Sequence, residues 1–309
     1  MTQVMSFHST NWSWFAFVRK VKVHPLFWFI LGIGMMTGYF REVIMVFSIV
    51  MVHELGHALT ATFFKWKLNK IELLPFGGVA EVENNGNQPF YQEFFIVIAG
   101  PIQHIWMIGL SFLLAGSTIW SMQAHELFVT HNLIILLFNL LPILPLDGGR
   151  LLQLFLLFNN PYKQAMLLSL RLSFFFLLIG MTVVIFLFPF HLNIWVVISF
   201  LLISHYLDWK QRHFRFMRFL MGRMEMRNHR SIKSLSIDGT ITVKEVVHLF
   251  ERNVTHRITY VDSRRGTMVI SEEELLDYFL HYGGRIRMYD WVRRHVPFDR
   301  DNRTSEIVK

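Results

Sequence analysis

The sequence predicts a membrane α-helical bundle of six transmembrane helices with a membrane-associated β-hairpin, followed by a small cytoplasmic α/β domain. The 309-residue chain is 53% hydrophobic, and its 31 Phe, 16 Met and 9 Trp exceed the needs of a soluble core. Its apolar residues gather in windows long enough to cross a bilayer. Residues 210–309, in contrast, hold 20 of the 30 Lys and Arg and 13 of the 22 Asp and Glu, which indicates a soluble domain.

The six apolar windows define the predicted spans. The last two could be one block, but about 43 residues at a rise of 1.5 Å each would overshoot any bilayer, so we expect two helices there. We expect four regions: an interfacial segment (1–22), the six-span domain (23–209), a basic juxtamembrane linker (210–230) and a distal domain (231–309). The predicted spans are residues 25–40, 43–64, 90–116, 127–146, 165–189 and 192–207.

The basic residues predict the orientation of the chain. With a cytoplasmic N-terminus, the inside segments hold eight Lys and Arg, whereas the outside loops hold Arg41 alone. This asymmetry predicts that both termini are cytoplasmic. The first 22 residues place aromatic residues before their basic cluster, the wrong order for a cleavable signal peptide, and are typical of an interfacial anchor. The eight inside residues are Arg19, Lys20, Lys22, Lys65, Lys67, Lys70, Arg150 and Lys163.

The segment 53–57 reads HELGH, an HExxH motif inside the second apolar window. On a helix, His53 and His57 share one face and can supply two ligands of a tetrahedral zinc site, with Glu54 beside them as a general base. A charged group near the middle of a bilayer costs about 2.5 to 3.5 kcal/mol, and such groups are functional by default. A chance HExxH on a soluble helix is therefore the weaker interpretation.

A third ligand is expected from the segment 139–150, which reads NLLPILPLDGGR at the end of the fourth window. Asp147 follows Pro145 and precedes two glycines that allow a sharp turn, so its carboxylate can point back into the bundle. Alone, Asp147 would be read as the cap of a surface turn. Together with HELGH, it predicts a His2Asp zinc site. Asn139 is either a hydrogen-bonding residue between helices or a donor to a developing oxyanion.

These motifs resemble the site-2 protease family of intramembrane zinc metalloproteases. HELGH, then AGP at 99–101, then LPLDGG at 144–149 stand in the family's order. The sequence is most similar to the sporulation factor IVFB branch, over the whole chain except about the first twenty residues. The resemblance implies zinc bound by His53, His57 and Asp147, Glu54 as general base and Asn139 near the substrate carbonyl. The family usually has asparagine directly before the proline of its Asp-Gly motif, where this chain has Leu144.

The segment 67–83 alternates apolar and polar residues around a Pro-Phe-Gly-Gly turn and predicts a β-hairpin. The family resemblance implies that Gly77, Gly78 and Val79 offer an edge strand that holds an unwound substrate. A plain cytoplasmic connector is the alternative. Gln103 and His104, inside the third window, are expected to be satisfied by a neighbouring helix.

The distal domain has capping boxes at Thr242 and Ser271, each opening a helix, with strands expected over 256–261 and 267–270. This strand, helix, strand, strand, helix order resembles a single cystathionine-beta-synthase (CBS) domain. Such domains bind adenine nucleotides in pairs, which implies a homo-oligomer formed through this domain. By resemblance, ATP is a regulator that contacts Ser271 and Glu274, the latter standing where the family usually has aspartate.

We therefore expect zinc-dependent peptide hydrolysis within the membrane. The family resemblance implies that the substrate is the membrane-associated pro-sequence of a sporulation sigma factor (pro-sigma-K), in the outer forespore membrane on the mother-cell side, with membrane inhibitor proteins as further partners. The basic linker predicts contact with anionic lipid rather than nucleic acid, because it begins at a membrane span. Zero cysteines exclude disulfides and thiol chemistry. A channel or transporter gated by a CBS domain is the competing function.

Overall fold

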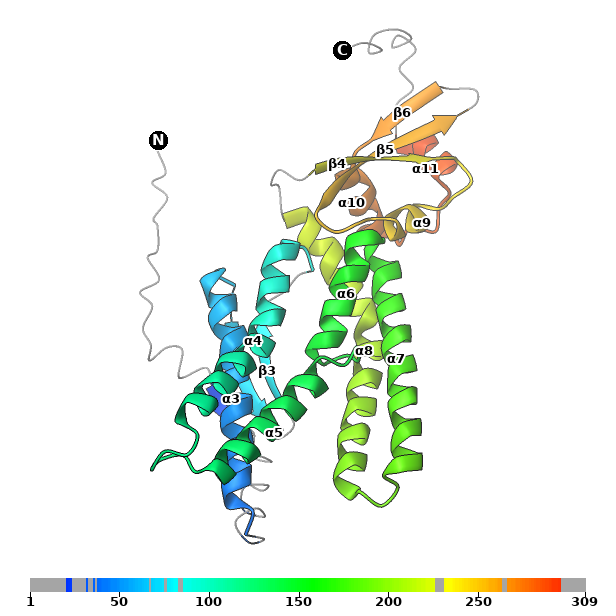
Figure 1. The fold of residues 1–309 in the computed structure, drawn as a ribbon. Coiled ribbons are helices and arrows are strands. Elements are labelled where there is room, and N and C mark those ends of the chain that lie inside the picture. Colours follow the sequence, from blue (N-terminus) through cyan, green and yellow to red (C-terminus); the bar gives the residue numbers. More distant parts are fainter. Residues whose placement is uncertain are drawn as a thin grey trace, which may run out of the picture. The chain divides into compact units, whose positions relative to one another are not determined.

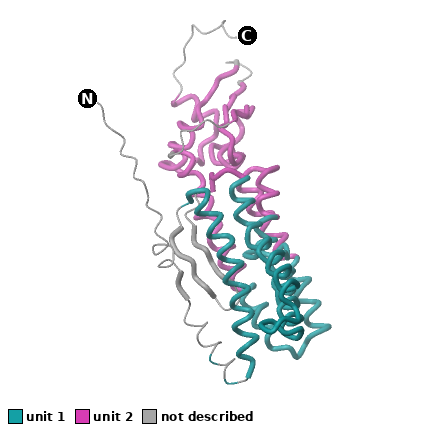
Figure 2. The backbone as a smooth tube through the Cα atoms, turned by 60° about the vertical axis from the view of Figure 1, so that its left-hand side comes forward, with its two compact units in different colours: residues 1–84, 91–151, 176–202 teal, residues 85–90, 152–175, 203–309 magenta. Residues whose placement is uncertain are grey.

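The computed structural model describes residues 21–23, 32, 36, 38–66, 68–74, 77–82, 86–225, 231–262 and 266–295. The chain divides into two compact units (Figure 2). Unit 1 comprises residues 1–84, 91–151 and 176–202, and unit 2 comprises residues 85–90, 152–175 and 203–309. Most of the expected span at 25–40 and most of the interfacial segment at 1–22 lie outside the described residues.

Unit 1 is built on the helices α3 (Phe40–Phe63), α4 (Phe90–Leu114) and α5 (Met122–Asn139), which are labelled in Figure 1. Helix α3 buries one face that includes Ile49, His53, His57 and Ala61. Each of these residues follows the previous one by four positions, so they lie on one side of an α-helix. Gly56 lets α3 approach α4 closely, because a Cβ there would be 2.6 Å from Ala99 O.

A small sheet belongs to the same unit. Its strand order is β1-β2-β3, from β1 (Val21–Val23), β2 (Leu68–Leu74) and β3 (Gly77–Val82). Strands β2 and β3 are antiparallel with Glu72 opposite Val79, which confirms the predicted hairpin, and both strands contact α3. Strand β1 pairs in parallel with β2, a strand that the sequence pattern did not predict. Among the described strands, β3 therefore forms an edge of this sheet.

Four described helices are long and apolar enough to cross a membrane: α3, α4, α7 (Tyr162–Leu187) and α8 (Leu192–Glu225). The predicted span at 127–146 has the wrong end, because α5 begins at Met122 and ends at Asn139. The physical reason is the pair Pro142 and Pro145, since the residue before a proline is sterically driven out of the helical region. Helix α6 (Asp147–Asn159) follows the break.

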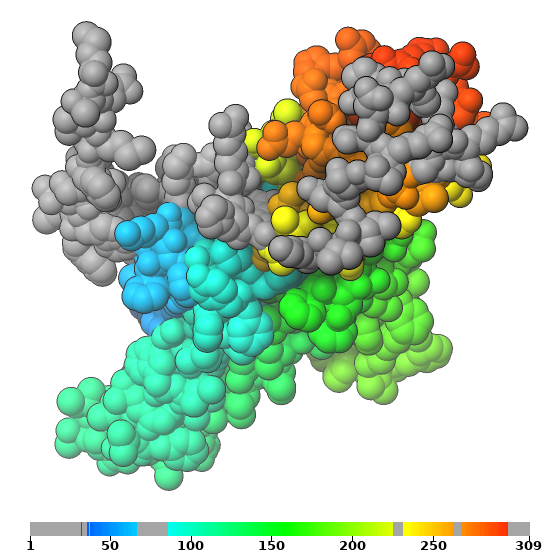
Figure 3. All heavy atoms as spheres, turned by 90° about the horizontal axis from the view of Figure 1, so that it is seen from above, coloured from blue at the N-terminus to red at the C-terminus, as the bar shows by residue number. Residues whose placement is uncertain are grey.

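Unit 2 contains the distal domain. After α8 the elements are β4 (Ser231–Ile237), α9 (Val243–His248), β5 (Val254–Asp262), β6 (Gly266–Ile270), α10 (Glu272–Tyr282) and α11 (Met288–His295). The sheet order is β4-β5-β6, with β4 parallel and β6 antiparallel to β5. The predicted order of strands and helices is thus confirmed from β4 to α10, and α11 is a further helix that was not predicted. In the space-filling view, β5, β6, α10 and α11, coloured orange to red, gather in one region (Figure 3).

The capping box at Thr242 is present in full, since its side chain accepts from Glu245 N and Glu245 returns the bond. Ser271 caps α10 by accepting from Glu274 N at 3.2 Å. Both helices thus begin where the sequence pattern predicts.

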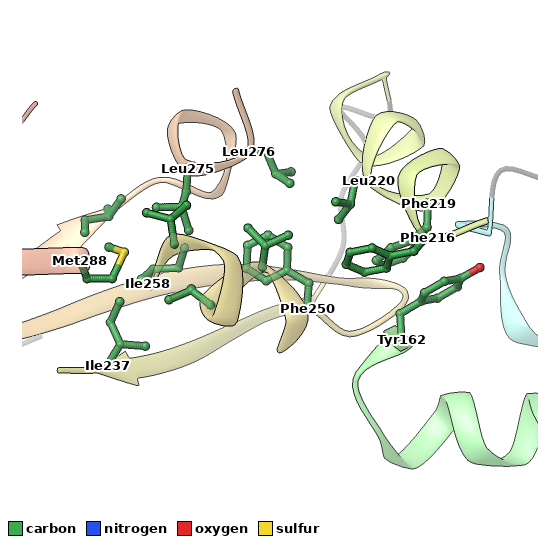
Figure 4. Packing of buried hydrophobic residues seen from close by; sticks show 14 of the residues in the cluster. Tyr162, Phe216, Phe219, Leu220, Ile237, Phe250, Ile258, Leu275, Leu276 and Met288 are labelled. Carbon is green, nitrogen blue, oxygen red and sulfur yellow. The ribbon is translucent and has the colours of Figure 1, made fainter. Parts of the chain in front are cut away.

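The core of unit 2 joins the end of α8 to the distal domain. Figure 4 shows Phe216, Phe219 and Leu220 of α8 between Tyr162 and Phe250. The Tyr162 and Phe219 rings stack with centroids 3.9 Å apart. Part of the apolar face of the predicted basic linker is therefore packed inside the protein, whereas Phe214 and Met221 are exposed. Arg223, expected to face lipid headgroups, is buried and paired with Glu272.

Candidate metal centre

Three side chains meet inside unit 1 at the buried face of α3. His53 Nε2 lies 3.1 Å from Asp147 Oδ2, and His57 Nε2 lies 3.2 Å from the same oxygen. The two Nε2 atoms are 3.1 Å apart. All three residues are buried, and together they form a group that could hold a metal ion. The structure thus brings together the three residues that the sequence predicts as ligands.

The backbone around Asp147 differs from the conformation that the sequence predicted. Asp147 is the first residue of α6, not a residue at the end of the preceding span. Neither Gly148 nor Gly149 has a positive φ, so conformational freedom is not their role. A Cβ at Gly149 would stand 2.5 Å from Ile143 C and Leu144 N, and a Cβ at Gly148 would overlap Leu140. The glycines are needed because the first turn of α6 packs directly on the backbone of residues 140–144.

A second layer of unit 1 supports this turn. Ile143 and Leu146 pack with Leu177 of α7 and Leu201 of α8 in one buried cluster. The carboxylate therefore projects from a segment that is held on its apolar side by two membrane helices.

The orientation of the His57 ring is determined by the hydrogen bond of its Nδ1 atom. His57 Nδ1 is 2.7 Å from Ile96 O on α4. A carbonyl oxygen can only accept, so Nδ1 carries the proton and donates, and Nε2 of the neutral ring presents a lone pair to the cluster. Histidine ligands of metals commonly donate their other N–H to a backbone carbonyl in this way.

The cluster fits a zinc ion by two criteria. A neutral-imidazole nitrogen and a carboxylate oxygen both offer lone pairs and repel one another at 3.1–3.2 Å unless a cation lies between them. Donor atoms at 2.0–2.1 Å from a tetrahedral zinc would stand about 3.3 Å apart, which is close to the observed spacing. Asp147 Oδ2 is moreover a buried oxygen that has no hydrogen-bond partner of good geometry among the described residues. The donor set therefore fits a zinc ion.

Glu54 follows the first ligand on α3 and is 7% exposed. Its carboxylate is therefore largely screened from bulk solvent.

The remaining predicted site residues lie in other places. Asn139 ends α5, and its Nδ2 donates to Ile135 O of its own helix at 3.1 Å. Gly77, Gly78 and Val79 lie on β3. Glu274 lies in the first turn of α10 in the distal domain of unit 2, and the Ser271 hydroxyl is engaged as the N-cap of that helix.

Two residues beside the candidate metal ligands were not predicted as site residues. His104 Nε2 lies 3.0 Å from His53 Nδ1, and Asn132 Oδ1 lies 3.0 Å from His104 Nδ1. His104 was expected to form a hydrogen bond with a neighbouring helix, and it does so with Asn132 of α5. The contact of His104 with the candidate ligand His53 was not predicted. A signal was present, since both are polar residues within apolar helices.

Gly100 gives a sharp test of this geometry. A Cβ at Gly100 would overlap the His57 ring and stand 2.7 Å from His53 Cε1. Gly100→Ala should therefore displace both imidazoles and weaken zinc binding at least tenfold, as measured by chelator competition on the purified protein. Gly109→Ala, on the same helix with no atom within 4 Å of the added methyl group, is the matched control. Unchanged zinc affinity in Gly100→Ala would contradict this packing.

An HExxH helix, a carboxylate from a later helix and apolar membrane helices around them define the class, a membrane metallohydrolase. The model of peptidase family M50 matches residues 42–124. Stage IV sporulation protein FB of Bacillus subtilis is 39% identical over 267 residues, covering 85% of this chain and 92% of that protein. A zinc metalloprotease of Methanocaldococcus jannaschii is 38% identical over 36% of this chain and 32% of its own length.

The site-2 protease structure from the same archaeon has 26% sequence identity and a TM-score of 0.48, covering 61% of this chain and 89% of that one. Because of the extensive similarity to the Bacillus protein, the chain belongs to peptidase family M50, and it is a zinc metalloprotease of the site-2 protease type. The family resemblance inferred from the motifs is confirmed.

Proposed function

We propose that the protein hydrolyses a peptide bond of a membrane-associated precursor inside the bilayer, with zinc held by His53, His57 and Asp147 and with Glu54 as general base. The observation that carries this proposal is the meeting of three buried lone-pair donors at 3.1–3.2 Å within apolar helices. One zinc per chain, measured on purified protein, together with cleavage of a membrane-tethered precursor, tests it. Protein without zinc would contradict it.

The residues divide the chemistry among them. Zinc, when bound, supplies Lewis acidity to the scissile carbonyl and to the attacking water. Glu54 takes a proton from that water as it adds to the carbonyl carbon, and then gives the proton to the nitrogen of the leaving amine as the C–N bond breaks. Asn139 is our candidate for a hydrogen bond to the carbonyl oxygen, by its second amide N–H.

The proposed substrate is the pro-sequence of a sporulation sigma factor, pro-sigma-K, cleaved on the mother-cell side of the outer forespore membrane. The similarity to a sporulation protein of Bacillus subtilis supports this choice. Membrane inhibitor proteins would be further partners. Co-expression with a tagged precursor, followed by detection of a shortened product, tests the substrate, and cleavage of other tethered precursors alone would argue against it.

The proposed topology has six spans, with α5 as the fourth, residues 25–40 as the first and both termini in the cytoplasm. We retain the proposed boundaries at 22, 209 and 230, although α8 runs without a break through residue 209. The partly exposed Arg212, which stacks on Trp209 with Cζ 4.2 Å from the ring, is suited to anionic headgroups at the bilayer surface.

The substrate must be extended before its amide is accessible, and β3 is the proposed template. As an edge strand it can accept a further strand through its backbone. Val79→Pro removes one N–H of this strand and should reduce cleavage at least tenfold with unchanged zinc content. Val79→Thr keeps the N–H and the β-branched shape, so it should cleave normally. Full cleavage by Val79→Pro would return the hairpin to the role of a connector.

The distal domain is proposed to be CBS-like and to pair with a second copy of the chain. If ATP binds at this pairing with contacts to Ser271 and Glu274, it can act only by favouring one arrangement of the domains. Glu274→Ala should then weaken ATP binding at least tenfold and abolish the effect of ATP on cleavage, without loss of zinc. Calorimetry on the full chain measures the first effect, and an unchanged ATP response in the variant would exclude Glu274.

A further inference from the structure

A buried hydrogen-bonded chain stands behind the first histidine ligand. On α5, Asn132 Nδ2 donates to Phe128 O at 3.0 Å. Asn132 Oδ1 lies 3.0 Å from His104 Nδ1 on α4, and His104 Nε2 lies 3.0 Å from His53 Nδ1 on α3. His104 and Asn132 are each 0% exposed, so water does not compete for these positions. The chain therefore links three helices in series.

The direction of every hydrogen bond in this chain is determined by its first member. The Asn132 amide group donates through Nδ2 to a carbonyl, so its oxygen faces His104. An amide oxygen only accepts, which places a proton on His104 Nδ1 and leaves Nε2 of the neutral ring as an acceptor. His53 Nδ1 must then donate to His104 Nε2. The consequence is that His53 Nε2 presents its lone pair to His57 and Asp147.

We propose that His104 and Asn132 are positioning residues that select the metal-binding tautomer of His53 and hold its ring in place. The inference rests on the proposed zinc site and extends it to two residues that do not touch the metal. The two proposed histidine ligands are then held in different ways. His57 is held by a hydrogen bond to a backbone carbonyl, and His53 is held by a series of hydrogen bonds between side chains. Loss of such a partner typically costs 10 to 100-fold in metal affinity.

The test measures zinc affinity, by competition with a chromophoric chelator, on the full-length protein in detergent. His104→Phe keeps a ring but removes the acceptor, and Asn132→Leu keeps the volume but removes the chain's first member. Each should weaken zinc binding about 10 to 100-fold. His104→Gln places an amide oxygen where Nε2 lies and should restore affinity to within about threefold of wild type. The visible absorption of bound cobalt(II), which reports ligand geometry, should change in the first two variants only.

A matched control exists on the same two helices. Ser111 Oγ of α4 and His125 Nδ1 of α5 lie 2.8 Å apart and are also buried, and among the described residues neither forms a hydrogen bond with His53, His57 or Asp147. His125→Phe should leave zinc affinity unchanged. If it weakens binding as much as His104→Phe, the effect is general packing between α4 and α5 and the proposal fails.

The proposal also fails if His104→Phe and Asn132→Leu bind zinc like wild type, or if His104→Gln restores nothing. Should His104→Phe not fold, as judged by size-exclusion chromatography, Asn132→Leu decides. Wild-type protein that binds no zinc would instead overturn the proposed function itself, so the two failures are distinguishable.

Discussion

Glu54→Gln should abolish cleavage while one zinc per chain remains bound. The amide keeps the size of the carboxylate but cannot take a proton from the attacking water, and general-base catalysis contributes about 10² to 10⁴-fold. Because Glu54 is buried on α3 and is not one of the three clustered donors, its loss should not empty the site. Metal analysis beside a cleavage assay separates these effects.

Two sets of variants complete this experiment. Ala at His53, His57 or Asp147 should each lower zinc content itself, because one of the three converging donors is removed. Glu42→Gln, in the first turn of the same helix, removes a carboxylate far from the cluster and should cleave normally. Full activity in Glu54→Gln would exclude Glu54 as the base, and ion flux that survives this substitution would favour the channel hypothesis.

The clustering of the two candidate histidine ligands could be predicted from the sequence because their motif carries its own signal. HExxH spaces two histidines by one helical turn, and charge inside an apolar span is costly enough to demand a use. No local rule predicts that Asp147 lies beside the two histidines, since ninety residues separate it from His57. It could be proposed as a ligand only because a third ligand was needed. The structure supplies the missing cause in the packing of α6 on residues 140–144.

Other parts of the site depend on contacts between helices and could not be predicted locally. Gly100 matters because two imidazoles fill the space of its missing side chain. His104 and Asn132 matter because three helices align them in one direction, whereas each alone is an ordinary polar residue in a span. The end of α5, in contrast, could have been predicted from Pro142 and Pro145. The predicted span was drawn from hydropathy alone and therefore extended beyond it.

The distal domain followed its local signals closely, because capping boxes and alternation act within a few residues. The packing of this domain against α8, in contrast, could not be predicted from local signals. Arg223 stands in a basic run typical of a lipid-facing helix, and its burial depends on Glu272, forty-nine residues later. A long-range ion pair of this kind produces no periodic pattern in the sequence from which it could be predicted.

The ion pair between Arg223 and Glu272 should dominate the stability of the distal domain. Arg223 Nε donates to Glu272 Oε1 at 2.5 Å, and one terminal nitrogen donates to Oε2 at 2.8 Å. The same guanidinium donates to Glu251 O at 2.6 Å and to Val254 O at 2.5 Å. Glu272 Oε2 also accepts from His256 N at 2.7 Å. Removing one charge therefore leaves the other buried and unpaired.

Glu272→Gln should destabilise the distal domain by about 3 to 5 kcal/mol, the typical cost of breaking a buried pair by removing one partner. Hydrogen exchange of β5 and α10 amides in the full-length protein measures this loss. Glu251→Gln, which removes the charge of the exposed Lys233–Glu251 pair, should cost less than about 1 kcal/mol. Equal protection in Glu272→Gln and wild type would show that the pair contributes nothing to stability.

The acid dependence of the domain provides a second readout. Burial alone would raise the pKa of Glu272, but hydrogen bonds from His256 and Arg223 and the Arg223 charge lower it to about 2. A carboxyl group with a depressed folded-state pKa stabilises the fold fully above its unfolded pKa of about 4.5 and loses that contribution as the pH falls toward 2. Wild-type exchange protection should therefore decline between these values. Glu272→Gln, with no proton to bind, should be less stable at neutral pH and should show a flatter decline over the same interval, and an identical pH dependence in the two proteins would exclude Glu272 as the titrating group.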